Sequence, residues 1–349
     1  MKKTLKIIII ICFIFIGKYS YSQTNNMDTN DMKEIIKYGS FAPSSHNAQM
    51  WSVEIMEKNK IKIYPNYDRV LPFVDPNNRE TWISIGAFVE NCVLAAQDLG
   101  YKSNVITNDN EIIIDFQQDD SITKINQNID LIKKRLTIRE PYLKKKITDA
   151  TIKKLSELSE NIVYFPIEDE KAQQIINHSI DAYSLQMKDT SKLEELAKWM
   201  TFSYKEEQER KDGLTPEVLG ITGFKHFLFN LFMSQKSVTG KTFIKSSIVS
   251  AEEQLNACSG YILITSNTFN NSDLVKSGRL LERVWLECIN NEIAVHPMSQ
   301  VLEEKEYYEL LKKSLNIKGE IQMVLRIGKV KKYPERIGKR LNIEDIIKE

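Results

Sequence analysis

Apolar and polar positions recur along the chain with two periods, which predict a mixture of strands and helices. Short runs rich in β-branched and aromatic residues predict strands over 111–116, 162–166, 261–266 and 321–328, and a pair of strands over 52–65 around a turn at 58–60. Longer runs of helical period predict helices over 32–38, 82–99, 121–135, 149–158, 251–257, 273–290 and 302–315, and several over 170–210. Without regular strand–helix–strand alternation, this mixture predicts an α+β fold.

The first residues have the layout of a secretory signal peptide. A basic start precedes an apolar run over 7–17 and a small-residue site at 20–22, so we expect a signal peptide over 1–22 that is cut before Gln23. The run is shorter than the roughly 20 apolar residues of a membrane span. Residues 23–31 are polar and predict a flexible leader. We expect an exported protein, periplasmic or secreted; an uncleaved membrane anchor is the alternative.

Composition narrows the classes of partner. The chain has 349 residues, 42% of them hydrophobic, which is enough for two core-forming units or one large domain. Its 48 Lys and Arg against 47 Asp and Glu give a net charge of +1, and so no electrostatic reason to expect nucleic acid or an anionic membrane as partner. Cys92, Cys258 and Cys288 are widely spaced in apolar stretches, so we expect buried free thiols rather than disulfides or a metal site.

The stretch FAPSSHNAQMW, residues 41–51, has an unusual mixture of residues. Pro43 lacks a backbone donor, and Ser44, Ser45 and Asn47 compete for backbone hydrogen bonds, so the stretch is a turn and not a helix interior. Large apolar residues bracket this polar turn on both sides. Two interpretations stay open: a turn that holds a ligand, and a helix end that runs through a turn into a strand.

A short repeat links the two longest predicted helices. A Gly–Glu–Leu pattern at four-residue spacing occurs in the helix over 82–99 and again in the helix over 273–290, offset by 192 positions. Its members are Gly86, Glu90, Leu94, Gly278, Glu282 and Leu286. Three matches in one helix also arise by chance, so the repeat predicts an internal duplication only together with other evidence.

The turn over 41–51 resembles the A-P-S-S-x-N-x-Q-P-W signature of the FMN-dependent nitroreductase family, with Met50 in place of the usual proline. The resemblance continues through Asp75-Pro76 and Arg79-Glu80, and is best over 41–101, 135–142 and 273–300. It points to an internally duplicated branch that includes flavin-sequestering proteins. It implies a nitroreductase-like fold, with two fused halves around mixed or antiparallel sheets and long central helices. The implied halves are 32–125 and 126–349, the second with a candidate lid over 211–248.

In this family FMN lies between two subunits, one supplying an arginine segment for the phosphate and the other the serine–asparagine turn. Here the turn occurs in the first half, whereas Arg135 and Arg139 open the second half. The resemblance therefore implies one hybrid FMN site per chain, and a monomer whose dimer-like interface is internal. Arg135 and Arg139 are four residues apart and share a face if the segment is helical. A solvated basic surface is the alternative.

The segment over 292–300 occupies the place of a family loop that lies against the flavin ring, and the basic tail resembles a C-terminal phosphate-binding motif. The full implied FMN-binding set is Pro43, Ser44, Ser45, Asn47, Gln49, Arg135, Arg139, His296, Pro297, Met298 and Arg340. We expect no catalytic side chain, because the flavin carries out the hydride chemistry. We expect no metal site, because the histidines show no ligand spacing.

The resemblance implies an oxidoreductase that uses FMN and NAD(P)H to reduce a small nitroaromatic or quinone-like acceptor. The alternative is a flavin-sequestering protein with little turnover, which export and the candidate lid favour. The glycines of 213–224 and the apolar run over 227–233 would form that lid over the flavin, unless the run is ordinary core. A family member that has lost its flavin is a third possibility.

Overall fold

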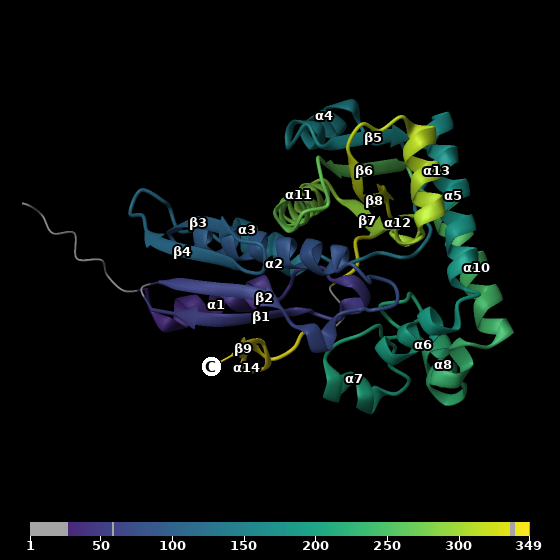
Figure 1. Cartoon of the computed structure of the whole chain (residues 1–349), viewed down its shortest axis with the longest axis horizontal. Coiled ribbons are helices and arrows are strands. Elements are labelled where there is room, and N and C mark those ends of the chain that lie inside the picture. The colour runs from purple at the N-terminus through teal and green to yellow at the C-terminus, as the bar shows by residue number, and fades with distance from the viewer. Residues whose placement is uncertain (1–26, 58, 336–338, 349) are drawn as a thin grey trace, which may run out of the picture.

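A computed structural model describes residues 27–57, 59–335 and 339–348 (Figure 1). The predicted signal peptide and the first part of the predicted leader lie outside the described residues. The described chain forms two sheets with helices between and around them, so the predicted α+β class is confirmed. Among the described residues, no helix is long and apolar enough to cross a membrane.

The first sheet has five strands in the order β3-β4-β2-β1-β9. Four of these strands pair antiparallel, each with the next in this order: β3 (Tyr101–Thr107), β4 (Ile112–Gln118), β2 (Lys60–Pro65) and β1 (Trp51–Met56). Every second residue of β2 and β4 is buried, which is the pattern of a sheet with one face on a core. The short β9 (Ile347–Lys348) adds a parallel edge, so the C-terminal end of the second half returns to the first sheet.

The second sheet has four antiparallel strands in the order β5-β6-β8-β7. They are β5 (Ile162–Pro166), β6 (Gly260–Ser266), β8 (Glu320–Lys329) and β7 (Ile293–Pro297). β6 and β8 are buried along nearly their whole length, because helices cover both faces of this sheet. The expectation of a loop over 292–300 was wrong for its first part, since residues 293–297 pair with β8 as a strand.

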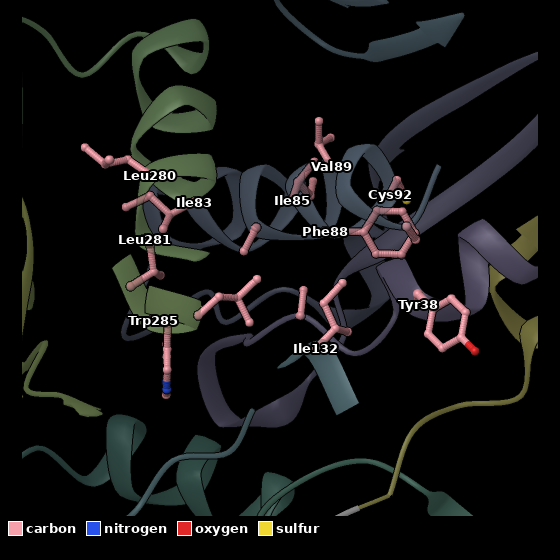
Figure 2. Packing of buried hydrophobic residues seen from close by; sticks show 14 of the residues in the cluster. Tyr38, Ile83, Ile85, Phe88, Val89, Cys92, Ile132, Leu280, Leu281 and Trp285 are labelled. Atoms are coloured by element: carbon pink, nitrogen blue, oxygen red, sulfur yellow. The ribbon is translucent and has the colours of Figure 1, made fainter. Parts of the chain in front are cut away.

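Two long helices, α2 (Arg79–Asp98) and α11 (Asn271–Asn290), pack on each other at the centre of the molecule. Figure 2 shows Ile83 of α2 beside Leu280 and Leu281 of α11, within a core cluster that continues along α2 to Phe88 and Cys92. This cluster contains residues of both sheets, so the two halves share one core. The predicted long central helices are confirmed, and the three cysteines are buried and free, as expected.

The other helices surround this centre. They are α1 (Thr29–Gly39), α3 (Gln127–Lys134), α4 (Asp149–Glu157), α5 (Glu170–Gln186), α6 (Thr190–Trp199), α7 (Tyr204–Arg210), α8 (Phe224–Phe232), α9 (Gln235–Val238), α10 (Lys241–Asn256), α12 (Gln300–Glu303), α13 (Lys305–Leu315) and α14 (Ile343–Ile346). In Figure 1, α6, α7 and α8 form a group at the lower right, away from the first sheet. This group has a small core of its own around Phe229 and Met200.

Two predicted helices differ clearly from the structure, and one strand was not predicted. The helix expected over 121–135 begins only at Gln127. The helix expected over 251–257 is the end of α10, which begins ten residues earlier. That earlier part is rich in serine and β-branched residues of modest helix propensity, and it is helical because Phe243, Ile244 and Ile248 pack on the small core. β3 was not predicted, because it is an edge strand with polar residues on its open face.

Candidate functional site

The polar turn after α1 has an unusual backbone. His46, Asn47 and Gln49 all have positive φ values, of 51°, 52° and 53°. Residues with a side chain rarely adopt this left-handed region, and such strain persists only where the surrounding structure enforces it. The Ser44 hydroxyl accepts a hydrogen bond of 3.0 Å from the Gln49 N–H, and the Ser45 hydroxyl donates to Glu80 at the start of α2. Ser44 therefore closes the turn on itself, and Ser45 holds the turn to α2.

Asn47 and Gln49 brace the turn against two distant segments. The Asn47 amide donates to the carbonyl of Gly213 at 3.1 Å, and the fully buried Gln49 amide donates to the carbonyl of Lys211 at 3.1 Å. The Gln49 side-chain oxygen accepts from the Leu341 N–H at 2.9 Å. These two amides connect the turn to the 211–213 segment and to the C-terminal segment.

A cavity of about 980 Å³ opens beside the turn. Its walls come from residues 43–46, from α2 and α11, from residues 296–300, and from α5, α6, α8 and α10. Leu281, Trp285 and Met298 provide flat or flexible apolar surface, and Arg139 and His296 provide polar groups. This size, and an apolar lining with a few polar groups, are typical of a site for a cofactor or a drug-sized ligand.

The cavity brings together seven of the eleven residues expected to bind FMN. The lining includes Pro43, Ser44, Ser45, Arg139, His296, Pro297 and Met298. It does not include Asn47, Gln49, Arg135 or Arg340. The residues that line it come from both predicted halves, which meet here across the central helices.

The two arginines of the second half lie in different environments. α3 ends at Lys134 and residues 135–139 are not helical, so Arg135 and Arg139 share no helix face. Arg135 is buried, with its guanidinium 4.9 Å from the ring centre of Trp285, and donates to the carbonyl of Phe41 at 2.8 Å. Arg139 reaches the cavity and donates one N–H to the carbonyl of Val218 at 2.7 Å. Burial lowers the pKa of Arg139 to about 10, so it is charged at neutral pH.

Arg340 holds the entry of the turn from the C-terminal side. It donates to the Asn47 side-chain oxygen at 2.8 Å, and to the carbonyls of Phe41 and Ala42 at 3.4 and 3.3 Å. Together with Arg135, it places two cationic donors on the carbonyls that precede Pro43. In this structure both arginines support the turn and lie behind the cavity wall.

His296 ends β7 with its ring on the cavity wall, and Arg326 fixes its protonation. The Arg326 Nε–H donates to His296 Nδ1 at 3.1 Å, so Nδ1 is an acceptor and the ring proton is on Nε2. Burial, and then the charges of Arg326 and Arg139, hold the pKa of His296 well below its usual range. The four other hydrogen bonds of Arg326, to the carbonyls of residues 138, 140, 254 and 257, fix it in place. His296 is a neutral N–H donor.

The comparison with known proteins finds sequence similarity over a short stretch of the chain. Two proteins of Mycobacterium tuberculosis, strains CDC 1551 and H37Rv, both named as NAD(P)H nitroreductases, are 28% identical to the chain over 82 residues. Over this stretch the chain is similar in sequence to these two nitroreductases. It spans about a quarter of the length of these curated relatives, 24% of each. No protein-family model matches the sequence.

A solved FMN-dependent nitroreductase of Mycobacterium smegmatis, in complex with NADPH, covers 61% of this chain and 95% of its own, with 13% identity and a TM-score of 0.39.

Beside the turn over 41–51 lies a pair of acidic side chains whose importance the sequence did not reveal. Glu80 and Glu303 both line the cavity. Glu80 accepts from Ser45 and from Arg79, and Glu303 accepts from the Gln186 amide at 2.6 Å. Burial, and then the negative charge of Glu80, raise the pKa of Glu303 well above its usual range, which favours a protonated carboxyl there. The only sequence signal was Arg79-Glu80 after the signature, since Glu303 is 223 residues away from Glu80.

The segment over 211–248 contributes to the cavity, and only part of the apolar run over 227–233 faces that cavity. Leu219, Ile221, Phe229 and Met233 line it. Phe227, Leu231 and Phe232, which were expected to shield the flavin ring, are exposed on the opposite side of α8. The start of α10 also lines the cavity with Lys241 and Thr242, together with hydroxyl groups further along the helix. Sequence reasoning missed α10 as a wall because it placed that helix ten residues too late.

Among the described residues, no group of three or more His, Cys, Asp or Glu side chains is arranged to hold a metal ion.

Proposed function

We propose that the chain is an exported, FMN-binding oxidoreductase that uses NAD(P)H to reduce nitroaromatic or quinone-like acceptors. One observation carries this proposal: a single cavity contains the serines of the signature turn together with Arg139 and residues 296–298. The sequence similarity to NAD(P)H nitroreductases supports the same assignment.

The cavity residues fit FMN in chemistry. Arg139 keeps N–H groups beyond its bond to Val218, and a guanidinium offers charge-assisted bonds to a phosphate. The Ser44 oxygen accepts from Gln49, so its own hydrogen is available to a ligand. His46 Nδ1, Trp285 Nε1 and Gln300 Oε1 belong to lining residues and are buried without a hydrogen-bond partner among the described residues. Buried polar atoms without a partner are rare, and a bound ligand would satisfy such groups.

When bound, FMN supplies the redox chemistry, because its ring accepts a hydride from a nicotinamide and passes electrons to the acceptor. We assign Arg139 to the phosphate and the Nε2–H of His296 to the polar edge of the ring. Leu281, Trp285 and Met298 would exclude water from the ring faces. The carboxyl of Glu303, which burial keeps protonated, holds a proton on the same wall.

A flavin-sequestering role is the second candidate, and the position of the 214–233 segment favours it. Leu219, Ile221, Phe229 and Met233 form an apolar part of the cavity wall, which would limit the access of a nicotinamide. Rapid reduction of the FMN-loaded protein by NADPH, followed by reoxidation with a nitroaromatic compound, would support the enzyme. Rapid reduction by dithionite together with very slow reduction by NADPH would support sequestration.

We also infer that the two halves arose by duplication. A Cβ on Gly86 would collide with the carbonyl of Val275, and a Cβ on Gly278 would collide with the carbonyl of Ile83. Positions 83 and 275 differ by 192, and so do positions 86 and 278. The repeat therefore relates the contact of Gly86 with residue 275 to the contact of Gly278 with residue 83. Export remains a proposal that rests on the predicted signal peptide. N-terminal sequencing of the protein recovered outside the cytoplasm tests it, and we expect Gln23 as the first residue.

A further inference from the structure

The helix α8 has apolar side chains on both of its faces, although only one face is covered. Its inner face places Phe229 in the small core formed with α6 and α9. Its outer face presents Phe224, Phe227, Leu231 and Phe232, of which Phe224 is 74% and Phe232 72% exposed. A helix that is apolar all round is normally buried, so an open face of this kind marks an interaction surface. We call these four side chains the outer α8 face.

The four side chains form one continuous stripe. Positions 224, 227 and 231 follow the spacing of a single helix face, and residue 232 adjoins it. The rings of Phe224 and Phe227 are stacked, with centroids 6.1 Å apart. α8 lies at the edge of the molecule in Figure 1, so no other described element covers the stripe.

The segment that carries this stripe has basic side chains and no acidic ones, and the acidic Glu207 and Glu217 contact His226 of α8 from outside it. Residues 218–251 contain no Asp or Glu, but they contain Lys225, Lys236, Lys241 and Lys245. All four lysines are exposed, and none forms an ion pair with a carboxylate of a described residue. Lys225 and Lys241 also line the cavity, whereas Lys236 and Lys245 do not. The net charge of the whole chain, +1, conceals this local excess of four positive charges over α8, α9 and the first turns of α10.

Exposed aromatic and leucine side chains flanked by unpaired lysines are the features by which an interfacial helix binds an anionic lipid surface. We propose that the outer α8 face, together with these lysines, docks the protein on the surface of an anionic phospholipid membrane. The apolar side chains enter the boundary between head groups and acyl chains, and the lysines contact the phosphates. Docking requires neither FMN nor turnover, so it stands or falls independently of the proposed function.

The docking segment is also the segment that lines the cavity. Phe229 and Met233 face the cavity from α8, while Phe227 and Phe232 face outward from the same helix. Membrane docking would therefore bring the cavity wall next to the lipid, where apolar quinone-like compounds are concentrated. This consequence rests on the proposed function, whereas docking itself does not.

Flotation with lipid vesicles tests the proposal, using the chain that begins at Gln23 and so retains every described residue. We expect the protein to float with vesicles of equal parts phosphatidylcholine and phosphatidylglycerol, and roughly tenfold less with phosphatidylcholine alone. The variant Phe224→Ser/Phe232→Ser should reduce binding to the anionic vesicles about tenfold, and Lys236→Gln/Lys245→Gln should reduce it several-fold.

Control variants change exposed residues of the same kind elsewhere on the molecule. Ile106→Ser/Phe269→Ser and Lys153→Gln/Lys154→Gln alter exposed positions on β3, before α11 and on α4. These controls should bind as the unmodified chain does, and all variants should keep its circular dichroism and melting temperature. Failure of the unmodified chain to float, or equal binding by the Phe224→Ser/Phe232→Ser variant, would overturn the proposal. So would a dimer in sedimentation velocity that this variant abolishes, because the occupant of the face would then be a second copy of the chain.

Discussion

Gly86 and Gly278 touch at the crossing of the two central helices. A Cβ atom built on Gly86 would lie 3.0 Å from the Cα of Gly278, and one built on Gly278 would lie 2.9 Å from the Cα of Gly86. The helices approach this closely only because both residues lack a side chain. α2 lines the cavity with Glu80, Ile83 and Ser84, and α11 lines it with Leu281 and Trp285, so this contact sets the distance between two walls of the site.

Substitution of Gly86 by alanine should destabilise the protein, although alanine has the higher helix propensity. The added methyl would collide with the backbone of α11, which cannot move aside as a side chain can. We expect a loss of about 3 kcal/mol or more in the free energy of unfolding, measured by urea denaturation. Gln97→Ala, at an exposed position of the same helix, is the control and should change stability by less than about 0.5 kcal/mol. Equal effects of the two substitutions would show that the helices separate easily.

Arg139→Ala should weaken FMN binding without unfolding the protein. Each charge-assisted hydrogen bond to a phosphate contributes about 1.5–3 kcal/mol, so the dissociation constant for FMN should rise at least about tenfold. Fluorescence titration of the apoprotein with FMN measures this change. Normal affinity in a folded Arg139→Ala variant would exclude Arg139 as the phosphate ligand.

Arg135→Ala provides the contrast, since Arg135 holds the carbonyl of Phe41 and stacks on Trp285 within the core. This variant should lower the melting temperature clearly, and its FMN affinity should fall only as far as the turn is disturbed. A variant that melts normally but fails to bind FMN would return Arg135 to the phosphate site.

His46 should make the protein less stable as the pH falls. Burial lowers the pKa of His46 to about 4, helped by the charge of Arg139 and opposed by Glu80, whereas the usual value is 6.5. Between these values the unfolded chain binds the extra proton, so stability decreases as the pH falls from about 6.5 to 4. The full difference corresponds to about 3 kcal/mol.

The variant His46→Asn isolates this effect, because asparagine tolerates the left-handed backbone and does not titrate. Relative to the unmodified chain, it should gain about 3 kcal/mol in the free energy of unfolding between pH 7.5 and pH 4. Asp75, whose pKa burial raises to about 6, changes stability in the opposite direction but is common to both proteins. Parallel stability curves across this range would contradict a neutral His46.

Access to the cavity should depend on the residues that line it and not on the exposed face of α8. Leu219→Ala/Ile221→Ala removes apolar volume from the wall, so we expect NADPH to reduce bound FMN several-fold faster in stopped-flow absorbance measurements. Phe227→Ala, an exposed position on the neighbouring helix, is the control and should leave the rate unchanged. If neither variant changes the rate, the 214–233 segment does not limit access.

The sequence predicted those features that depend on neighbouring residues. Buried and exposed positions alternate in β2 and β4, and this period of two predicts strands. The long apolar faces of α2 and α11 predict helices in the same way. The start of α10 and the strand β7 could not be predicted in this way, since contacts with the small core and with β8 decide their conformation. Local propensity does not contain this information.

The same distinction applies to the site. The signature turn and Arg139 were found from local motifs, and they meet in one cavity. The motif could not show that Asn47 accepts a hydrogen bond from Arg340, or that Gln49 accepts one from Leu341. Each of these contacts joins positions almost 300 residues apart. Nor could it show the pairing of Glu80 with Glu303, which depends on how α12 packs beside α5.

The central claim is that each chain holds one FMN, between the signature turn of the first half and Arg139 of the second. Its most direct test is the ratio of released flavin to protein, measured by absorbance after the folded chain is saturated with FMN and freed of excess by gel filtration. We predict one FMN per chain. A ratio of two would contradict the single hybrid site, and a ratio of zero would show that the chain does not bind the flavin.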